Sequence, residues 1–251
     1  MPRGYGAMRY ELKYYLPLEV ADDVRRFITP YVVHDPYCAD LPGHRYTVRS
    51  IYLDTDDLRF YSEKLDSLNN RKKVRVRTYN EPDGDTEAFI EIKRKFGRLG
   101  SKDRLQLPWP KVDHALNGKD PAEVLSGRHF RDRKTLEKIR FLMHVNELRP
   151  TVLVAYEREA FVGREDRRVR VTFDQNIRSL QHPTLDQIFA EQELRQFEDD
   201  HFILELKFDN VMPVWMSRLI RSHGLQAESY SKYCQGIDAW SGGLQPMATA
   251  E

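Results

Sequence analysis

Three copies of the pattern Glu-x-Lys lie in separate strand-like segments of this chain, at Glu11 and Lys13, at Glu91 and Lys93, and at Glu205 and Lys207. Residues two apart in a β-strand point to the same face, so each copy sets a carboxylate beside an ammonium group. Gathered inside one barrel, these groups would form a cationic pocket that also holds a few carboxylates for a divalent metal. Such a pocket is suited to a polyanion such as a triphosphate.

Further cations alternate with apolar residues. Lys73, Arg75 and Arg77 are separated by single valines, and Arg168 and Arg170 repeat the arrangement. A sheet with one face in water gives the same alternation with no function. However, these segments favour Arg and Lys over neutral polar residues, and arginine is suited to bidentate phosphate contacts. We therefore expect the cations to face either solvent or a bound polyanion, since burying them unpaired would cost several kcal/mol each.

The acids of the three Glu-x-Lys copies are candidate metal ligands. Mg²⁺ or Mn²⁺ accepts one or two carboxylates together with phosphate oxygens, and Glu11, Glu91 and Glu205 could supply them. A local ion pair with the lysine two residues on is the alternative for each glutamate. The eight histidines show no metal-ligand spacing, and no P-loop pattern occurs. The residues from Gly97 to Gly100, with Lys102 and Arg104 after them, could form a mobile basic loop, but we interpret them as a plain turn.

The elements that must position these residues follow from periodicity. Strand patterns cover residues 8–16, 45–54, 71–79, 87–96, 103–107, 151–161, 167–174 and 202–208. Helical patterns follow Pro17 and cover residues 56–67, 121–125, 131–145, 185–197, 214–222 and 230–239. Eight mostly antiparallel strands interleaved with helices predict one closed α+β domain over residues 1–240, followed by a disordered tail at 241–251.

Composition excludes several classes of protein. The chain has 251 residues, 40% of them hydrophobic and 31% charged, which is typical of a globular protein. Lys and Arg number 40 against 39 Asp and Glu, so net charge gives no case for nucleic-acid binding. No apolar segment approaches the ~20 residues that span a bilayer, and the start lacks a signal-peptide core. We expect a soluble cytoplasmic protein without direct membrane insertion.

In their order along the chain, these segments resemble the polyphosphate polymerase (VTC) domain family, a branch of the triphosphate tunnel enzymes. The resemblance runs from about residue 8 to residue 240. Its motifs are Arg9–Tyr14, Ser50–Thr55, Lys73–Arg77, Glu91–Lys93, Tyr156–Arg158, Arg168–Arg170, Glu205–Lys207 and Ser231–Tyr233. It implies an eight-stranded antiparallel β-barrel with flanking helices, whose lumen binds a triphosphate with Mn²⁺ or Mg²⁺. In such enzymes the γ-phosphate of ATP passes to a growing polyphosphate chain.

The resemblance also implies roles for individual residues. Catalytic roles fall to Lys13, Arg75, Arg77, Lys93, Glu205 and Lys207. Substrate contacts fall to Arg9, Tyr156, Arg158, Arg170, Ser231 and Lys232, although a solvated side chain is the alternative for Lys232. Glu205 is the principal expected metal ligand, with Glu11 and Glu91 beside it.

Three functions stay open at this point. Hydrolytic tunnel enzymes tend to begin with Glu-x-Glu-x-Lys, whereas Arg9 fills the first of those positions here. Hydrolysis gains from extra carboxylates that position a water or a second metal. Transfer to a phosphate end needs charge neutralisation and in-line positioning instead. A polymerase is therefore favoured over a triphosphatase or a non-catalytic polyphosphate-binding module. Whether a separate membrane protein takes up the product stays open.

Overall fold

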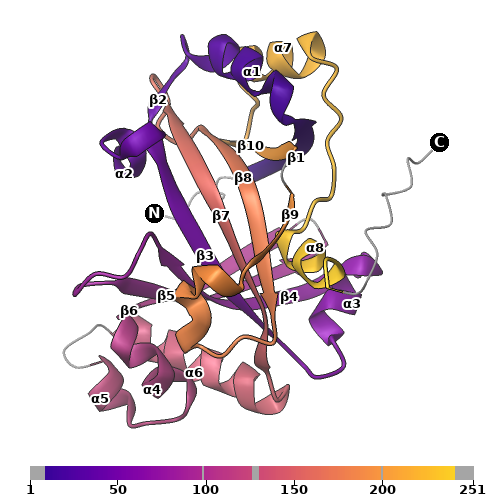
Figure 1. Ribbon diagram of the computed structural model, residues 1–251. Coiled ribbons are helices and arrows are strands. Elements are labelled where there is room, and N and C mark those ends of the chain that lie inside the picture. Colours follow the sequence, from indigo (N-terminus) through magenta and orange to yellow (C-terminus); the bar gives the residue numbers. More distant parts are fainter. Residues whose placement is uncertain (1–8, 98, 126–129, 199, 241–251) are drawn as a thin grey trace, which may run out of the picture. The chain divides into compact units, whose positions relative to one another are not determined.

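The computed structural model describes residues 9–97, 99–125, 130–198 and 200–240 (Figure 1). Its strands are β1 (Arg9–Pro17), β2 (Val32–His34), β3 (Arg45–Asp54), β4 (Asn70–Tyr79), β5 (Glu87–Phe96), β6 (Leu99–Pro108), β7 (Arg149–Gly163), β8 (Arg170–Gln181), β9 (Arg195–Glu198) and β10 (His201–Asp209). Its α-helices are α1 (Ala21–Ile28), α2 (Pro36–Ala39), α3 (Arg59–Leu65), α4 (Val112–Leu116), α5 (Pro121–Leu125), α6 (Phe130–Val145), α7 (Val214–Ser222) and α8 (Lys232–Asp238). The tail predicted to be disordered and Arg98 of the predicted turn lie outside the described residues.

The strands form one sheet, and the predicted α+β class with an antiparallel sheet and flanking helices is confirmed. Hydrogen bonding orders eight strands as β1-β10-β8-β7-β3-β4-β5-β6, with β2 paired to β7 and β9 paired to β8. The pairs β1/β10, β10/β8, β3/β4, β4/β5 and β5/β6 are all antiparallel. All eight predicted strands occur on this path. Among the described helices, none is both long and apolar enough to cross a bilayer.

Two parts of the sequence-based prediction were wrong. The helix predicted over residues 185–197 is instead two 3₁₀ turns, Asp186–Phe189 and Glu191–Glu193, followed by β9. Tertiary ion pairs select this path, because Glu191 lies 2.9 Å from Arg49 Nη2 and 2.8 Å from Arg178 Nη2. The turn predicted near Gly100 belongs to β6, which begins before the expected residue 103.

Contacts between Cα atoms divide the chain into two compact units. Unit 1 comprises Met1–Thr47, Tyr156–Ile177 and Glu198–Ser231, and unit 2 comprises Val48–Ala155, Arg178–Phe197 and Lys232–Glu251. The single domain expected from the sequence stays a prediction. Each unit has its own buried apolar cluster and its own polar strand face.

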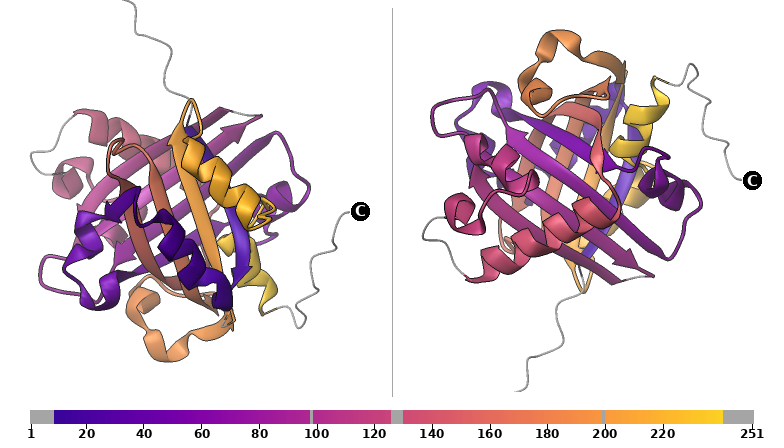
Figure 2. Two further views of the ribbon diagram at one scale, coloured as in Figure 1. Left: turned by 90° about the horizontal axis from the view of Figure 1, so that it is seen from above. Right: turned by 90° about the horizontal axis from the view of Figure 1, so that it is seen from below.

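In unit 1, α1 and α7 cover the apolar face of the strands. Phe202, Leu204, Leu206 and Phe208 alternate along β10 and pack with residues of both helices in one buried cluster. Figure 2 (left) shows α1 and α7 side by side over these strands. Because strand side chains alternate, the intervening residues Glu205 and Lys207 point to the opposite, polar face.

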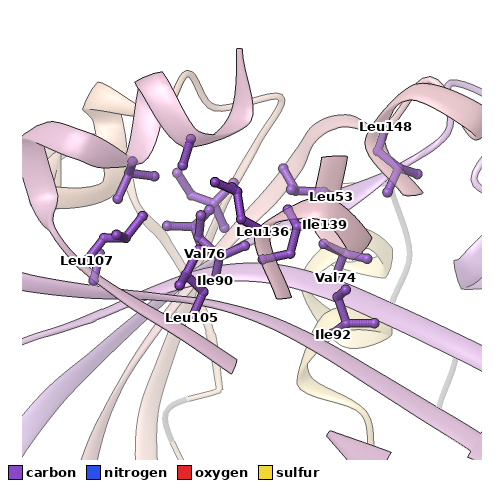
Figure 3. Close-up of a cluster of buried hydrophobic side chains, with 14 of the residues drawn as sticks. Leu53, Val74, Val76, Ile90, Ile92, Leu105, Leu107, Leu136, Ile139 and Leu148 are labelled. Carbon is purple, nitrogen blue, oxygen red and sulfur yellow. The ribbon is translucent and has the colours of Figure 1, made fainter. Parts of the chain in front are cut away.

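In unit 2, α6 covers the apolar face of β3 to β6 (Figure 2, right). Val74 and Val76 of β4 and Ile90 of β5 meet Leu136 and Ile139 of α6 (Figure 3). Fully burying each such side chain stabilises the fold by about 1.5–3 kcal/mol. This burial fixes the orientation of β4 and β5, and it turns their charged residues to the other face.

One buried carboxylate ties the end of β3 to α3 and α8. Asp54 is fully buried and accepts hydrogen bonds from the backbone N–H groups of Phe60 at 2.8 Å and Tyr61 at 2.9 Å. It also accepts from its neighbour Thr55 N at 2.8 Å and from the hydroxyl of Tyr233 on α8. Asp54 thereby satisfies donors at the start of α3 and anchors the helix that follows Ser231.

We predict that Asp54→Ala lowers the free energy of unfolding by about 3 kcal/mol or more, because several buried donors lose their acceptor at once. Urea denaturation followed by circular dichroism measures the change. The matched control is Asp56→Ala, whose side chain is 73% exposed in its ion pair with Arg149 and which we expect to shift stability by less than about 0.5 kcal/mol. Equal stability of the two variants would contradict the anchoring role of Asp54.

Candidate functional site

Each unit carries a cluster of charged side chains on the polar face of its strands. In unit 1 the Glu205 cluster consists of Glu11, Lys13, Arg158, Asp174, Glu205 and Lys207. In unit 2 the Glu91 cluster consists of Tyr52, Lys73, Arg75, Arg77, Glu91, Lys93, Lys102 and Arg104.

In the Glu205 cluster, two Glu-x-Lys motifs lie against each other in opposite directions. The antiparallel register of β1 and β10 sets Lys13 opposite Glu205 and Glu11 opposite Lys207. Charges therefore alternate both along and across the strands, and opposite-charge pairs of this kind stabilise a sheet. The sequence pattern predicted the shared face, but the sign of each cross-strand neighbour follows from the register.

Glu205 is the central acid of this cluster, and only 4% of it is exposed. Its Oε2 lies 2.5 Å from Lys207 Nζ and 3.4 Å from Arg158 Nη2, and its Oε1 lies 3.6 Å from Lys13 Nζ. Lys13 is in turn 3.4 Å from Glu11. For both Glu11 and Glu205, the ion pair with the lysine two residues on is therefore present in the structure.

Arg158 is held by a second acid, Asp174 of β8. Its Nε and Nη2 donate to the two carboxylate oxygens at 2.5 and 2.6 Å, and Asp174 is fully buried. Burial alone would lower the pKa of Arg158, but Asp174, Tyr156 and Glu205 outweigh it and raise the pKa well above its usual value. The guanidinium carbon also lies 5.3 Å from the ring centre of Tyr156. The two residues of the Tyr156–Arg158 motif thus share one site.

The other residues expected to bind substrate have varied surroundings. Arg170 lies 2.8 Å from the buried carboxylate of Asp35, which caps α2. Arg9 is exposed at the start of β1, whereas Ser231 and Lys232 are both buried. The solvated alternative for Lys232 therefore does not hold. Their contacts with phosphate stay predictions.

The Glu91 cluster is built from cross-strand rows. Arg75 of β4 lies opposite Tyr52 of β3 and Glu91 of β5, and Glu91 lies opposite Arg104 of β6. The next row places three lysines side by side, Lys73, Lys93 and Lys102. Neighbouring strands are about 4.8 Å apart, so these rows concentrate positive charge on a small area.

Glu91 neutralises part of this charge. It is 1% exposed, and its Oε2 accepts from Arg75 Nε at 2.8 Å and Nη2 at 2.5 Å. Its Oε1 pairs with Lys102 and lies 3.4 Å from Arg104 Nε. Burial would raise the pKa of Glu91, but Arg75, Arg77 and Lys102 outweigh it and hold the pKa far below its ordinary range. With both oxygens engaged by cations, Glu91 is placed to orient arginine. Both oxygens of Glu205 are engaged by cations in the same way, so the expected metal-ligand role of each acid stays a prediction.

The pKa of Tyr52 is lowered by the cations around its hydroxyl group. Arg75 Nη1 donates to its hydroxyl at 3.3 Å, and Arg77 Nε donates to Ser50 one row away at 2.9 Å. Burial would raise the pKa of Tyr52, yet Arg75, Arg77 and Lys73 lower it from 10.0 to about 8. A tyrosine that ionises this easily indicates a site with excess cations and room for anionic ligands.

The two clusters differ in charge balance. In the Glu205 cluster, Glu11, Asp174 and Glu205 match Lys13, Arg158 and Lys207 in number. In the Glu91 cluster, the contacts described above place one acid, Glu91, among the cations Lys73, Arg75, Arg77, Lys93, Lys102 and Arg104 and pair it with three of them. The Glu91 cluster therefore suits phosphate, whereas the Glu205 cluster offers the carboxylate oxygens that a divalent metal needs.

Sequence reasoning missed several members of these clusters. Lys102 and Arg104 were grouped with the turn after Gly97 and given no site role, although residues 103–107 were predicted as a strand; in β6 they alternate with Asp103 and Leu105 of the other face. This alternation in the sequence could have predicted that Lys102 and Arg104 lie on the polar face. Asp174 and Tyr52 gave no comparable signal, because a single acid or tyrosine in a strand has many other roles.

A further acidic group lies in unit 1, where Glu198, Asp200 and His201 offer ligand atoms within 4.8 Å of one another. Glu198 already accepts hydrogen bonds from Tyr15 at 2.6 Å and from Tyr230 at 3.2 Å. His201 Nδ1 lies 2.6 Å from Asp200. These contacts account for the group as an end-of-strand network.

Comparison with known proteins places this chain in a family. The family model described as the VTC domain matches residues 8–241. Subunit 4 of the vacuolar transporter chaperone complex of Schizosaccharomyces pombe is 27% identical over 225 residues, which is 76% of this chain and 31% of that protein. Subunit 2 of the same complex is 24% identical over 220 residues, covering 74% and 30%. A solved structure of the Hippeastrum protein HpAC1, reported with a dominant triphosphatase activity, has 14% identity and a TM-score of 0.48, covering 97% of this chain and 100% of that one.

The chain belongs to the VTC domain family, as the match over nearly all of its length shows. The family resemblance inferred from the ordered motifs is thus confirmed. The matched region spans about a third of the length of the two curated relatives.

We predict that Tyr52 titrates near pH 8 and that bound tripolyphosphate moves its pKa back toward 10, because the anion offsets the cations around it. Ultraviolet difference spectroscopy of the wild type against Tyr52→Phe measures both values. Since the folded pKa is depressed, the associated gain in stability is complete above pH 10 and is lost as the pH falls through 8. A Tyr52 signal unaffected by tripolyphosphate would place phosphate away from this cluster.

Proposed function

We propose that this chain is a metal-dependent polyphosphate polymerase that transfers the γ-phosphate of ATP to a polyphosphate chain. The observation that carries the proposal is the Glu91 cluster, in which one buried acid lies among six cations and pairs with three of them, within a chain of the VTC domain family. Such an excess of fixed positive charge supports binding of several phosphates at once.

In this proposal Arg75 and Arg77 hold phosphate oxygens. Glu91 fixes Arg75 through two hydrogen bonds, and Ser50 fixes Arg77 through Nε. An arginine already oriented loses less freedom on binding, and its charge is in place before the transition state forms. Lys93, Lys102 and Arg104 are more exposed and add charge around this pair.

Mn²⁺ or Mg²⁺ is the proposed cofactor, and Glu205 is the residue that would hold it. Its carboxylate is buried, and Lys13 lies between it and Glu11, which would bring a second carboxylate nearby. The metal would neutralise phosphate charge during transfer. Two carboxylates with phosphate oxygens make a donor set that either ion accepts.

The reaction needs no strong base. A terminal oxygen of the polyphosphate acceptor forms a bond to the γ-phosphorus of ATP, while the bond from that phosphorus to the bridging oxygen of ADP breaks. The acceptor is already an anion, so the side chains of this protein have only to bind, align and neutralise two negative groups. Arg9, where hydrolytic relatives tend to carry a carboxylate, supports transfer over hydrolysis.

We expect purified protein with ATP, Mn²⁺ and a short polyphosphate primer to release ADP and to lengthen the primer. Gel sizing of the polyphosphate together with an ADP assay measures both products in one reaction. Release of free phosphate without chain growth would make the protein a triphosphatase instead. Binding of polyphosphate without any turnover would make it a non-catalytic binding module.

We predict that Glu205→Gln lowers turnover on the order of 100-fold or more and leaves the affinity for tripolyphosphate within a few-fold of wild type. The substitution removes a carboxylate but leaves Lys13, Arg158 and Lys207 in place to attract phosphate. Initial rates and calorimetric binding measure the two effects. Glu137→Gln, on the exposed face of α6, is the control and should change neither. Parallel loss of binding and turnover would indicate that Glu205 is only a structural ion pair.

A further inference from the structure

The polar face of β4 and β5 carries cations beyond the Glu91 cluster. Arg71 lies opposite Lys95, one row past the pair Lys73 and Lys93 and two rows past Arg75 and Glu91. By strand parity Arg71 and Lys95 share the face of the Glu91 cluster. Gly100 of β6 lies opposite Lys95 and adds no side chain to the row. We call Arg71 and Lys95 the terminal cation pair.

The terminal cation pair is costly for the sheet. Like charges directly opposite each other on neighbouring strands are destabilising. Among the described residues, no carboxylate forms an ion pair with either Arg71 or Lys95. The next acid on this face along the paired strands is Glu91, which already has three cationic partners.

The other face of the same strands holds an acid beside its cations. There Lys72 lies opposite Arg94, and Arg94 is paired with Asp103 of β6, which also lies 2.8 Å from Lys138 of α6. Asp103 thus gives two of the cations on the α6 side an acidic partner, whereas among the described residues neither Arg71 nor Lys95 has one. Two facing cations without an acidic partner, on a face that already gathers cations, indicate an anionic ligand there.

We propose that the terminal cation pair is an additional binding site for phosphates of a polyphosphate chain, adjoining those held by the Glu91 cluster. This proposal rests on polyphosphate being the substrate class given above. Rows of cations about 4.8 Å apart across strands and about 7 Å apart along them match a ligand that carries charge at every unit. The pair would bind long chains and leave ATP and tripolyphosphate unaffected.

The side chains favour polyphosphate over nucleic acid. Proteins that bind single-stranded nucleic acid combine basic grooves with aromatic rings on which bases stack. None of Arg71, Lys73, Lys93 and Lys95 is aromatic, and the ring of Tyr233, whose centre lies 5.6 Å from Lys73 Nζ, is itself buried. Polyphosphate has no bases, so a site that binds it needs no aromatic ring for stacking.

The test compares Arg71→Gln/Lys95→Gln with wild type in equilibrium binding of long polyphosphate and of tripolyphosphate, without ATP or metal. We expect the affinity for long polyphosphate to fall about tenfold and the slope of log affinity against log salt to fall by about 1–2, since two ion contacts are lost. The affinity for tripolyphosphate should change less than about twofold. Because no turnover is measured, this result is independent of whether the protein proves to be a polymerase.

Two control variants sharpen the test. Lys72→Gln/Arg133→Gln removes the same charge from the opposite face of β4 and from exposed α6, and should leave both affinities unchanged. Arg71→Lys/Lys95→Arg keeps the charge and should restore binding of long chains. Without ligand, the glutamine pair should melt no lower than wild type, because a repulsion has been removed.

Equal loss of affinity for both ligands, or an equal effect of the opposite-face control, would overturn the proposal. Tighter binding of a single-stranded oligonucleotide than of polyphosphate of equal charge would do the same.

Discussion

The charged face of unit 2 depends on the ion pairs that the buried carboxylate of Glu91 forms with neighbouring cations. A buried carboxylate normally costs free energy, but here Arg75, Lys102 and Arg104 converge on it and hold it ionised. In return it orients Arg75 and offsets some of the repulsion among neighbouring cations. Without this acid, cations packed on adjacent strands would repel one another. The strands can carry cations so close together because their other face is held by apolar packing and because Glu91 lies among the cations.

The Glu-x-Lys pattern has different charge surroundings in the two units. At Glu205 the antiparallel register alternates acids and bases, which gives a balanced network that contains carboxylate oxygens. At Glu91 the register brings cations together, which gives an excess of positive charge and a depressed tyrosine pKa. The proposed phosphotransferase activity would call on carboxylates for a metal and on cations for phosphate. Membership of the VTC domain family is consistent with that combination.

Much of the fold could be predicted from alternation and turn residues. The eight predicted strands all occur, and α5 and α7 have the predicted bounds, because a proline marks the start of each helix. The helix predicted over residues 185–197 failed because ion pairs from Glu191 to distant arginines select a turn there. The start of β6 was missed because Gly97 and Gly100 are typical of turns. Long-range contacts decided the first case, and local hairpin pairing of β5 with β6 decided the second.

The sequence by itself determined which side chains share a face, since a two-residue period leaves no choice once the apolar side is buried. It also determined the family, through the order of short charged motifs. Only the tertiary structure decided which charges become neighbours, because strand register is set by the pairing of distant segments. Thus Glu11 and Glu205 pair with the lysines two residues on, as their spacing allows, whereas Glu91 pairs with residues of β4 and β6. The spacing of residues along a strand determines the face to which each side chain points, and the pairing of strands determines which charges become its neighbours.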